Sequence, residues 1–325
     1  NVPRTEFNAS FMYQNRPEFT RTMISTSWGY SGSLSRGRFI YQLYPLQAKI
    51  VRLTDIDDDF YQKFSGNQFL FNAYIDHFDL GSGGTVYYTT NADVNPKSTY
   101  KYIRFQLDAS GNLLSLFNSS MKEDRRGKRL ILWDIPYSQY IRSELTLGST
   151  IFFGSSDNQS VAFRLQGGYS VAYGNSFTVP LEKQFYSGGA SSMRGWQVRT
   201  LGPGRAKMED VMIIPSQTGD IKLEANAEYR FPMFWKLQGA FFLDVGNTWQ
   251  AKDWGDEGYI GADFLKSIAA DWGLGARVDL TFLVLRVDLG VKLYDPSING
   301  IGWYGPAEWR RKDCYAVHFG VGYPF

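Results

Sequence analysis

Residues 221–231, IKLEANAEYRF, alternate without exception between two kinds of side chain. Successive side chains of a β-strand point to opposite faces, so this pattern predicts a strand with one apolar and one charged face. Similar alternation recurs at 141–153, 161–173, 271–280 and 283–293. The chain is therefore expected to be built from two-faced strands, with almost no helical periodicity.

The predicted strands are about ten residues long or longer, which suits a tilted membrane-spanning strand better than a soluble one. One short helical turn is expected near 57–64. About twelve strands are predicted, at approximately 4–14, 18–31, 37–53, 76–91, 98–108, 137–153, 160–173, 221–232, 237–249, 269–280, 282–294 and 314–325.

Composition and connection lengths point to a membrane. The 325 residues include 24 Phe, 21 Tyr and 9 Trp, an aromatic load that a barrel in lipid can place on its outer surface. Short turns alternate with long loops, as in bacterial outer-membrane barrels. We therefore predict an all-β, transmembrane antiparallel β-barrel in the bacterial outer membrane, with residues 1–325 forming one barrel domain. The long connections fall near 54–75, 109–136, 174–220, 250–268 and 295–313.

Other classes are disfavoured. A soluble β-sandwich also alternates, but its polar face does not usually carry so many charges of both signs. A net charge of +2 argues against a nucleic-acid partner. One cysteine and two histidines exclude an internal disulfide and the usual zinc sets. We expect no enzyme activity, no catalytic residues, no metal and no cofactor.

The segment 185–204, FYSGGASSMRGWQVRTLGPG, is too long for a hairpin turn and too rich in glycine for a helix. It resembles the long loop of the outer-membrane assembly superfamily that includes BamA and TamA. Two later stretches, 226–232 and 241–249, resemble the next two strands of that family, with Glu228 and Asp244 at its acidic positions. The residues that match the loop motif are Phe185, Gly188, Gly189, Ser192, Arg194, Gly195 and Trp196.

The resemblance implies that this loop folds back inside the barrel and places Arg194 against the inner wall. Physical reasoning agrees, because Glu228 lies on the charged face of its strand and Asp244 shares a face with Ala240 and Phe242. Two inward carboxylates on neighbouring strands are costly without a cation, and one guanidinium can bond both. We therefore expect Arg194 to pin the loop to Glu228 and Asp244.

Two alternatives compete with this pin. Arg194 could be a surface residue, with the carboxylates paired to Arg230 or Lys222 instead. Glu228 and Asp244 could also form a glycosidase-like catalytic pair, although nothing in the sequence marks a substrate cleft.

The chain ends in YAVHFGVGYPF, which alternates from Tyr315 to Phe325 and looks like the C-terminal recognition signal of outer-membrane barrels. We expect its apolar face to meet lipid, and glycine and proline to weaken its pairing. The residues assigned to this signal are Phe319, Gly320, Val321, Gly322, Tyr323 and Phe325.

The chain departs from the family pattern in length. Family members carry periplasmic POTRA domains and sixteen barrel strands, so twelve strands suggest an N-terminally truncated barrel that lacks the first strands. Closure of the last strand onto residues 4–14, as a smaller barrel, is the alternative.

The resemblance implies a component that assembles and inserts other barrels through a lateral seam. Its expected partners are nascent outer-membrane β-barrel proteins, lipids and lipopolysaccharide of the outer membrane, and periplasmic or lipoprotein accessory subunits. The alternatives are a two-partner secretion pore and the membrane anchor of a surface-delivered enzyme.

Minor motifs carry less weight. The acidic run 55–59 starts like a calcium loop but lacks the required glycine, and the basic cluster 125–129 is most simply a solvated loop, with lipopolysaccharide phosphates as the alternative. Cys314 is expected to be inert, and His318 to make hydrogen bonds inside the lumen.

Overall fold

Twelve β-strands dominate the computed structural model, which describes residues 3–16, 19–56, 68–93, 96–125, 127–131, 134–154, 158–206, 217–255, 257–280, 283–297, 302–309 and 311–325. They are β1 (Arg4–Asn15), β2 (Thr20–Leu34), β3 (Phe39–Thr54), β4 (His77–Thr89), β5 (Tyr100–Ser110), β6 (Tyr140–Phe153), β7 (Gln159–Ala172), β8 (Ile221–Pro232), β9 (Leu237–Trp249), β10 (Ala269–Asp279), β11 (Val284–Tyr294) and β12 (Tyr315–Val321).

Helical structure is confined to short pieces, and no described helix has the length and apolarity needed to cross a membrane. The predicted turn at 57–64 and most of the acidic run 55–59 lie outside the described residues. The helices are α2 (Gln68–Ala73), α3 (Asn112–Ser115) and the 3-10 turns η1 (Ser35–Gly37), η2 (Asn118–Ser120), η5 (Leu181–Lys183) and η6 (Phe264–Ser267).

The strands form one sheet in sequence order, from β1 to β12. The predicted number of strands is confirmed, and most predicted ends lie within two or three residues of the observed ones. The match is closest at β8 and β9, whose bounds are 221–232 and 237–249 as predicted. Within the described sheet, β1 pairs with β2 and β12 with β11, and each of these two outer strands has one neighbour.

The charged face of the strands is buried and the apolar face is exposed, which is the reverse of a soluble protein. In β8, Lys222, Glu224 and Glu228 are buried, whereas Leu223 and Tyr229 are exposed. A soluble sandwich would bury the apolar face, because apolar burial drives its folding. The sandwich alternative is therefore wrong, and the exposed apolar face is the one suited to lipid.

By proximity of its residues the chain divides into two compact units. The first comprises Asn1–Tyr88, Arg104–Glu144 and Tyr169–Gln184. It contains the regular β1–β2 ladder, whose register runs from Arg4 opposite Ser31 to Asn15 opposite Thr20. It also contains a small buried cluster near α2, in which the Phe19 and Tyr74 rings meet edge to face at 5.8 Å.

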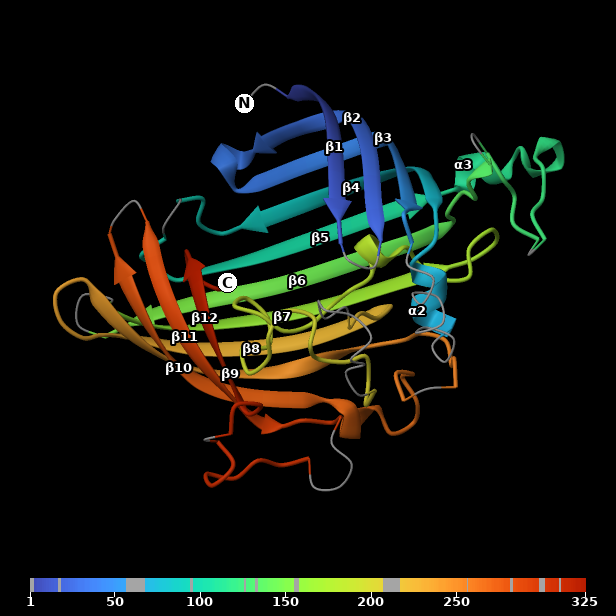
Figure 1. Ribbon diagram of the computed structural model, residues 1–325. Helices are drawn as coiled ribbons and strands as arrows, with labels where there is room; N and C mark the ends of the chain where they lie inside the picture. Colours follow the sequence, from blue (N-terminus) through green and yellow to red (C-terminus); the bar gives the residue numbers. More distant parts are fainter. Residues whose placement is uncertain are drawn as a thin grey trace. The chain divides into compact units, whose positions relative to one another are not determined.

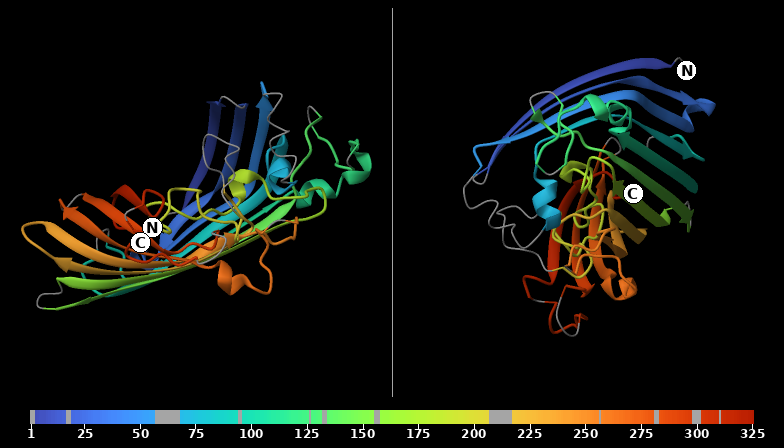
Figure 2. Two further views of the ribbon diagram at one scale, coloured as in Figure 1. Left: turned by 60° about the horizontal axis from the view of Figure 1, so that its bottom comes forward. Right: turned by 90° about the vertical axis from the view of Figure 1, so that its right-hand side faces the viewer.

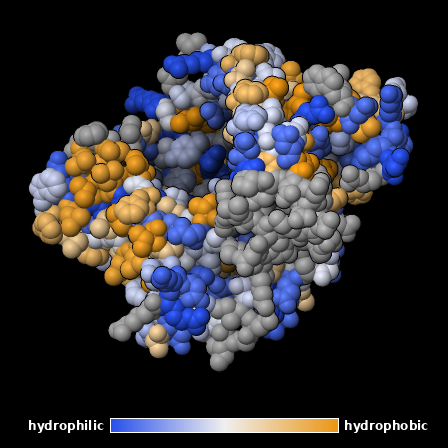
Figure 3. Space-filling view, in the orientation of Figure 1, coloured by the Kyte–Doolittle hydropathy of each residue, from blue (hydrophilic) through white to orange (hydrophobic). Residues whose placement is uncertain are grey.

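The second unit comprises Thr89–Ile103, Leu145–Gly168 and Phe185–Phe325. In it β8 to β12 lie side by side, and the greater part of the connection between β7 and β8 runs beside them (Figure 1, Figure 2). Apolar side chains gather on its surface at the left of Figure 3. Among the exposed apolar residues of this unit are Met233, Phe234 and Trp235, in the turn between β8 and β9.

The end of the chain differs from the prediction. Tyr315, Val317, Phe319 and Val321 present the expected exposed apolar face, but β12 ends at Val321 rather than at Phe325. Gly322 has a φ of +82°, a left-handed conformation that ends the strand.

Beyond that glycine, the last residues turn toward the charged face. The Tyr323 ring lies 4.3 Å from the Arg230 guanidinium, and the Phe325 carbonyl oxygen accepts a hydrogen bond from Arg230 at 3.1 Å. The prediction that Tyr323 and Phe325 face lipid is therefore wrong, because these aromatic rings pack against arginines instead.

Candidate functional site: a loop fixed to the wall of β8–β12

The connection between β7 and β8, here called the long loop (Tyr173–Asp220), enters the second unit at Phe185. The backbone of Phe185 exchanges two hydrogen bonds with Gly219, at 2.9 and 2.8 Å. Its ring is buried over Gly168 of β7, where a Cβ would come within 2.5 Å of a ring carbon. The first residue of the motif therefore holds the entry and exit of the loop together.

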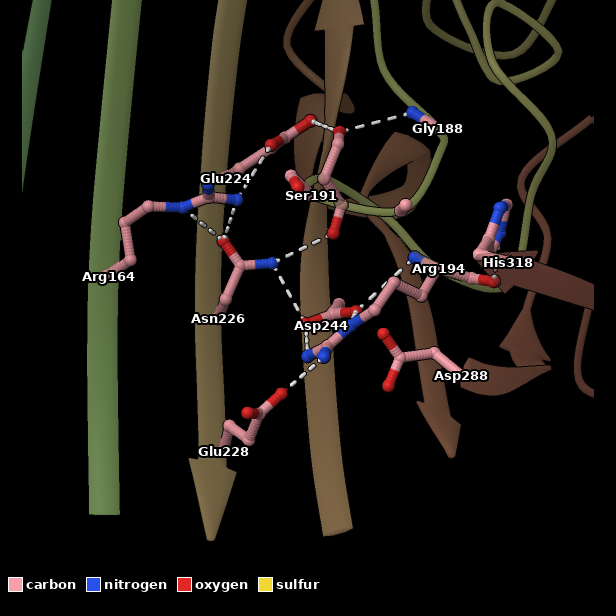
Figure 4. Close-up of polar contacts among 12 residues, drawn as sticks. Arg164, Gly188, Ser191, Arg194, Glu224, Asn226, Glu228, Asp244, Asp288 and His318 are labelled. Carbon is pink, nitrogen blue, oxygen red and sulfur yellow. Dashed lines mark hydrogen bonds and ion pairs between the residues drawn. The ribbon is translucent and has the colours of Figure 1, made fainter. Parts of the chain in front are cut away.

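Two glycines form the turn that leads to the tip. Gly188 and Gly189 have φ values of +95° and +101°, which other residues rarely adopt. The Gly188 amide donates to Ser192 Oγ at 3.1 Å, and the Gly189 amide donates to the Trp196 carbonyl at 2.9 Å. These bonds bend the backbone back on itself and direct Arg194 toward β9 (Figure 4).

Arg194 is fully buried and faces two carboxylates. Its Nε and Nη2 donate to Asp244 Oδ2 and Oδ1 at 2.8 and 2.9 Å, a bidentate pairing. Its Nη1 donates to Glu228 Oε2 at 2.5 Å. The guanidinium also lies 3.5 Å from the centre of the Phe242 ring. The alternative in which Arg194 is a surface residue is therefore wrong.

The electrostatic balance favours a permanently charged Arg194. Burial alone would lower the pKa of its guanidinium, but the charges and hydrogen bonds of Asp244 and Glu228 outweigh burial and raise that pKa. Glu228 also pairs with Arg230 at 2.7 Å and with Arg277 at 2.8 Å. Arg230, which the sequence offered as an alternative partner of the carboxylates, thus pairs with Glu228 alongside Arg194.

A second acidic residue of β8 holds the turn. Glu224 Oε1 accepts hydrogen bonds from the hydroxyls of Ser187 and Ser192, at 2.7 and 2.5 Å. Asn226, which lies between Glu224 and Glu228 on the same face, donates to the Ser192 carbonyl at 3.1 Å. The buried face of β8 therefore contacts the loop at three successive inward positions (Figure 4).

The far side of the loop contacts β11 and β12. Arg286 donates to the Ala190 carbonyl and to Ser191 Oγ, at 2.6 and 2.8 Å. His318 Nε2 lies 3.0 Å from the Arg194 carbonyl oxygen. The lumen hydrogen bond expected for His318 is therefore made to the loop itself.

The remaining motif residues fill space between these contacts. Gly195 lies against Asp271 of β10, where a Cβ would meet the Asp271 Cβ at 2.6 Å. Trp196 is buried with Met193, Leu201 and Ala269 in a small apolar cluster. The tip is thus packed as well as charge-paired, and six of the seven motif residues lie in it, whereas Phe185 lies at the entry of the loop.

Sequence reasoning missed several residues of this site: Glu224, Asn226, Asp271, Arg286 and Gly290. A signal was present for some of them, because Glu224 and Asn226 share the inward face of β8 with Glu228 at the strand period of two. Arg286 and Gly290 lie on β11, where a Cβ added to Gly290 would overlap the Arg194 carbonyl oxygen. The sequence does not reveal the register of this strand against the loop.

The basic cluster and Cys314 were also singled out in the sequence. In the basic cluster, Lys128 Nζ lies 3.4 Å from the centre of the Phe177 ring, and Arg129 pairs with Glu123 at 2.8 Å. Cys314 is buried, and burial raises the pKa of its thiol, so it stays protonated at neutral pH.

Comparisons with known proteins identify the family and the fold. The family model described as the Omp85 superfamily domain matches residues 3–325. Over 127 residues, 38% of this chain and 16% of the relative, the chain is 29% identical to the outer membrane protein assembly factor BamA of Neisseria meningitidis.

Solved structures show the same fold. A crystal structure of BamA from Haemophilus ducreyi lacking POTRA domains 1–3 matches with a TM-score of 0.61 at 13% identity, covering 98% of this chain and 59% of that one. CdiB from Acinetobacter baumannii matches with a TM-score of 0.52 at 15% identity, covering 93% and 42%. CdiB from Escherichia coli matches with a TM-score of 0.53 at 14% identity, covering 97% and 48%.

The chain thus spans about three fifths or less of the length of each of these proteins. The likenesses and the twelve-stranded antiparallel sheet confirm the expected fold class, a transmembrane β-barrel, and the expected outer-membrane localisation. With the family model matching residues 3–325, the chain belongs to the Omp85 superfamily.

Proposed function

We propose that this chain is the barrel portion of a component that assembles or inserts other β-barrel proteins in the outer membrane. The observation that carries the proposal is the buried pairing of Arg194 with Glu228 and Asp244, which fixes a long loop against the charged wall. The relative named as an assembly factor makes assembly the first candidate for the whole protein.

The chemistry of this function is non-covalent and resides in β12. That strand has 7 residues, whereas its partner β11 has 11. A short strand with one neighbour offers unpaired backbone groups, which cannot remain unsatisfied in lipid. A client strand can pair with them by backbone hydrogen bonds, so we place the lateral seam at β12.

The loop has a different part in this function. Its ion pairs with β8 and β9 and its hydrogen bonds with β11 and β12 stiffen the wall next to the seam, because charge-assisted hydrogen bonds are strong and directional. We propose that Arg194 is the pin, that the surrounding glycines allow the close approach, and that the strands of this chain work together as one barrel domain.

Nascent barrel proteins are the proposed clients. Lipids, lipopolysaccharide and accessory subunits are proposed partners of the same barrel. The exposed aromatic residues of the β8–β9 turn, Phe234 and Trp235, suit a lipid interface.

Site-specific photocrosslinking in the full-length protein tests the seam. A photoreactive residue at Val317 or Val321 of β12 should capture the terminal strand of a client during assembly. The matched control is Leu243 of β9, which is similarly outward but lies between two paired neighbours. Client capture that is equal at Leu243, or absent at β12, contradicts the proposed seam.

A two-partner secretion pore is the second candidate, and the fold likeness to the two CdiB structures favours it. The two functions predict different cargo. A secretion pore passes an unfolded chain through the lumen, so photocrosslinks to cargo should appear on inward residues rather than on β12. A surface-enzyme anchor predicts cargo contacts at neither position.

A further inference from the structure

The base of the long loop is held by a second charged cluster, in the first unit. Glu182 of η5 lies near the start of the loop, where its carboxylate faces basic side chains from three strands. Arg21 Nη2 of β2 lies 2.7 Å from it, Lys49 Nζ of β3 lies 2.5 Å, and His77 Nε2 of β4 lies 3.0 Å. One carboxylate therefore gathers side chains from three consecutive strands.

The next residue extends this contact to two further strands. Lys183 Nζ lies 3.8 Å from Asp108 Oδ1 of β5, and the Lys183 carbonyl accepts a hydrogen bond from Arg142 Nε of β6 at 2.9 Å. Leu181, on the other side of Glu182, is buried. Two adjacent residues of the loop thus contact five strands that are consecutive in the sheet, β2 to β6.

The charge balance of the cluster depends on Glu182. Burial would raise its pKa, but His77, Lys49 and Arg21 outweigh burial and hold that pKa well below its ordinary value. Glu182 is therefore ionised at physiological pH. Without it, Arg21 and Lys49 would face each other with their shared counter-charge removed, and like charges in a partly buried site repel.

A metal ion is the competing explanation of this cluster. Ligand atoms of His77, Asp79 and Glu182 lie within 4.8 Å of one another, and Asp79 Oδ1 is buried without a hydrogen-bond partner. However, Lys49 Nζ contacts the same Glu182 oxygen that faces His77. The chain's own cations already occupy the space around that oxygen, and their charge opposes a divalent ion.

We propose that Glu182 is a positioning residue that anchors the base of the long loop to β2–β6, independently of the Arg194 pin at the loop's tip. The inference rests on the proposed function, in which a fixed loop is needed for assembly. It adds that the loop is fixed at two charged sites, one in each compact unit, and that these sites can be released separately.

Site-resolved proteolysis of the full-length protein in lipid bilayers tests this anchor. Trypsin can cut after Lys183, next to the anchor, and after Arg199, beyond the pin. Each cleavage rate is divided by the rate at the same bond in the urea-unfolded chain. This ratio removes the effect of the substitution on how well trypsin recognises the neighbouring bond. Glu182→Gln keeps the shape of the side chain but removes its charge.

We expect Glu182→Gln to speed cleavage after Lys183 on the order of tenfold and to leave cleavage after Arg199 unchanged. Arg194→Ala should show the reverse pattern. Glu182→Asp, which keeps the charge, should stay closer to the parent than Glu182→Gln. The matched control is Asp263→Asn, which removes a carboxylate from the exposed pair with Lys266.

Three outcomes overturn the proposal. Cleavage after Lys183 that does not rise in Glu182→Gln shows that the charge does not hold the loop base. A rise at both sites in Glu182→Gln and also in Arg21→Gln, which leaves two of the three basic side chains, shows general destabilisation and no local anchor. Zinc that protects the parent, but not Glu182→Gln, at micromolar concentration assigns the cluster to a metal.

The same variants separate this inference from the proposed function. If Glu182→Gln releases the loop base but client assembly is unchanged, the anchor stands and the role of the loop in assembly is wrong. If assembly falls in Arg194→Ala while Glu182→Gln leaves both cleavage rates unchanged, the proposed function stands and the second anchor is wrong.

Discussion

Gly290 of β11 faces the backbone of Arg194 so closely that a Cβ at position 290 would overlap the Arg194 carbonyl oxygen and lie 2.7 Å from the Gly195 nitrogen. The loop tip therefore reaches the wall by backbone contact as well as through its side chains. Only a residue without a side chain at position 290 allows the backbones of the loop and of β11 to approach this closely.

Gly290→Ala should displace the loop tip from β11. The added methyl group must push the Arg194 carbonyl away, at a cost typical of overpacking, about 1–3 kcal/mol. The measurement is the rate of tryptic cleavage after Arg199, which should rise while the barrel still folds.

The control for this substitution is Gly167→Ala in β7, where an added Cβ meets nothing within 4 Å. Both changes alter glycine to alanine within a strand, so they share the same backbone effect. Equal cleavage rates in the two variants would show that Gly290 does not set the approach of the loop.

Glu224→Ala should loosen the turn that precedes Arg194. The substitution leaves the hydroxyls of Ser187 and Ser192 without their shared acceptor in a buried site, at a cost of about 1–3 kcal/mol. Urea unfolding in detergent micelles measures this cost. The exposed Glu257→Ala serves as control, and a loss of stability no larger than that of the control contradicts the role of Glu224.

Asp220, the last residue of the loop, should make stability depend on pH. Burial raises the pKa of Asp220 from 3.8 to about 6. The folded state then holds its proton more tightly than the unfolded state, so this stabilisation is present below about pH 4 and is lost as pH rises through about 6. The difference amounts to about 3 kcal/mol.

Asp220→Asn removes this titration and should therefore be the more stable protein at neutral pH. The free energy of unfolding of parent and variant, measured from pH 4 to pH 7, gives the contribution by difference. A difference that stays constant over that range shows that Asp220 does not titrate as described.

The strand positions could be predicted because they depend on a local property. The period of two in 221–231 follows directly from the pleat, and it located both ends of β8 and the inward side chains of Glu224 and Glu228. The placement of Arg194 needed the family resemblance, since the loop that carries it has no period of its own.

The features that escaped prediction depend on distant partners. Glu182 meets Arg21 across 161 residues of sequence, and no local pattern pairs them. The end of β12 at Val321 depends on Gly322 and on Arg230, which draws Phe325 inward across 95 residues. The apolar and polar residues alternate uniformly up to Phe325, so the sequence pattern does not reveal the turn at Gly322.

Hydrogen exchange of the loop amides tests the central claim that Arg194 fixes the loop to the wall. The full-length protein in lipid bilayers is compared with Arg194→Ala, and with Arg199→Ala as the control for loss of a charge from the same loop. Breaking a buried pair costs up to about 3–5 kcal/mol. Arg194→Ala should therefore raise exchange across 188–195 on the order of a hundredfold, while β8 and β9 keep their protection. Protection of 188–195 that is equal in the parent and in both variants would contradict the account.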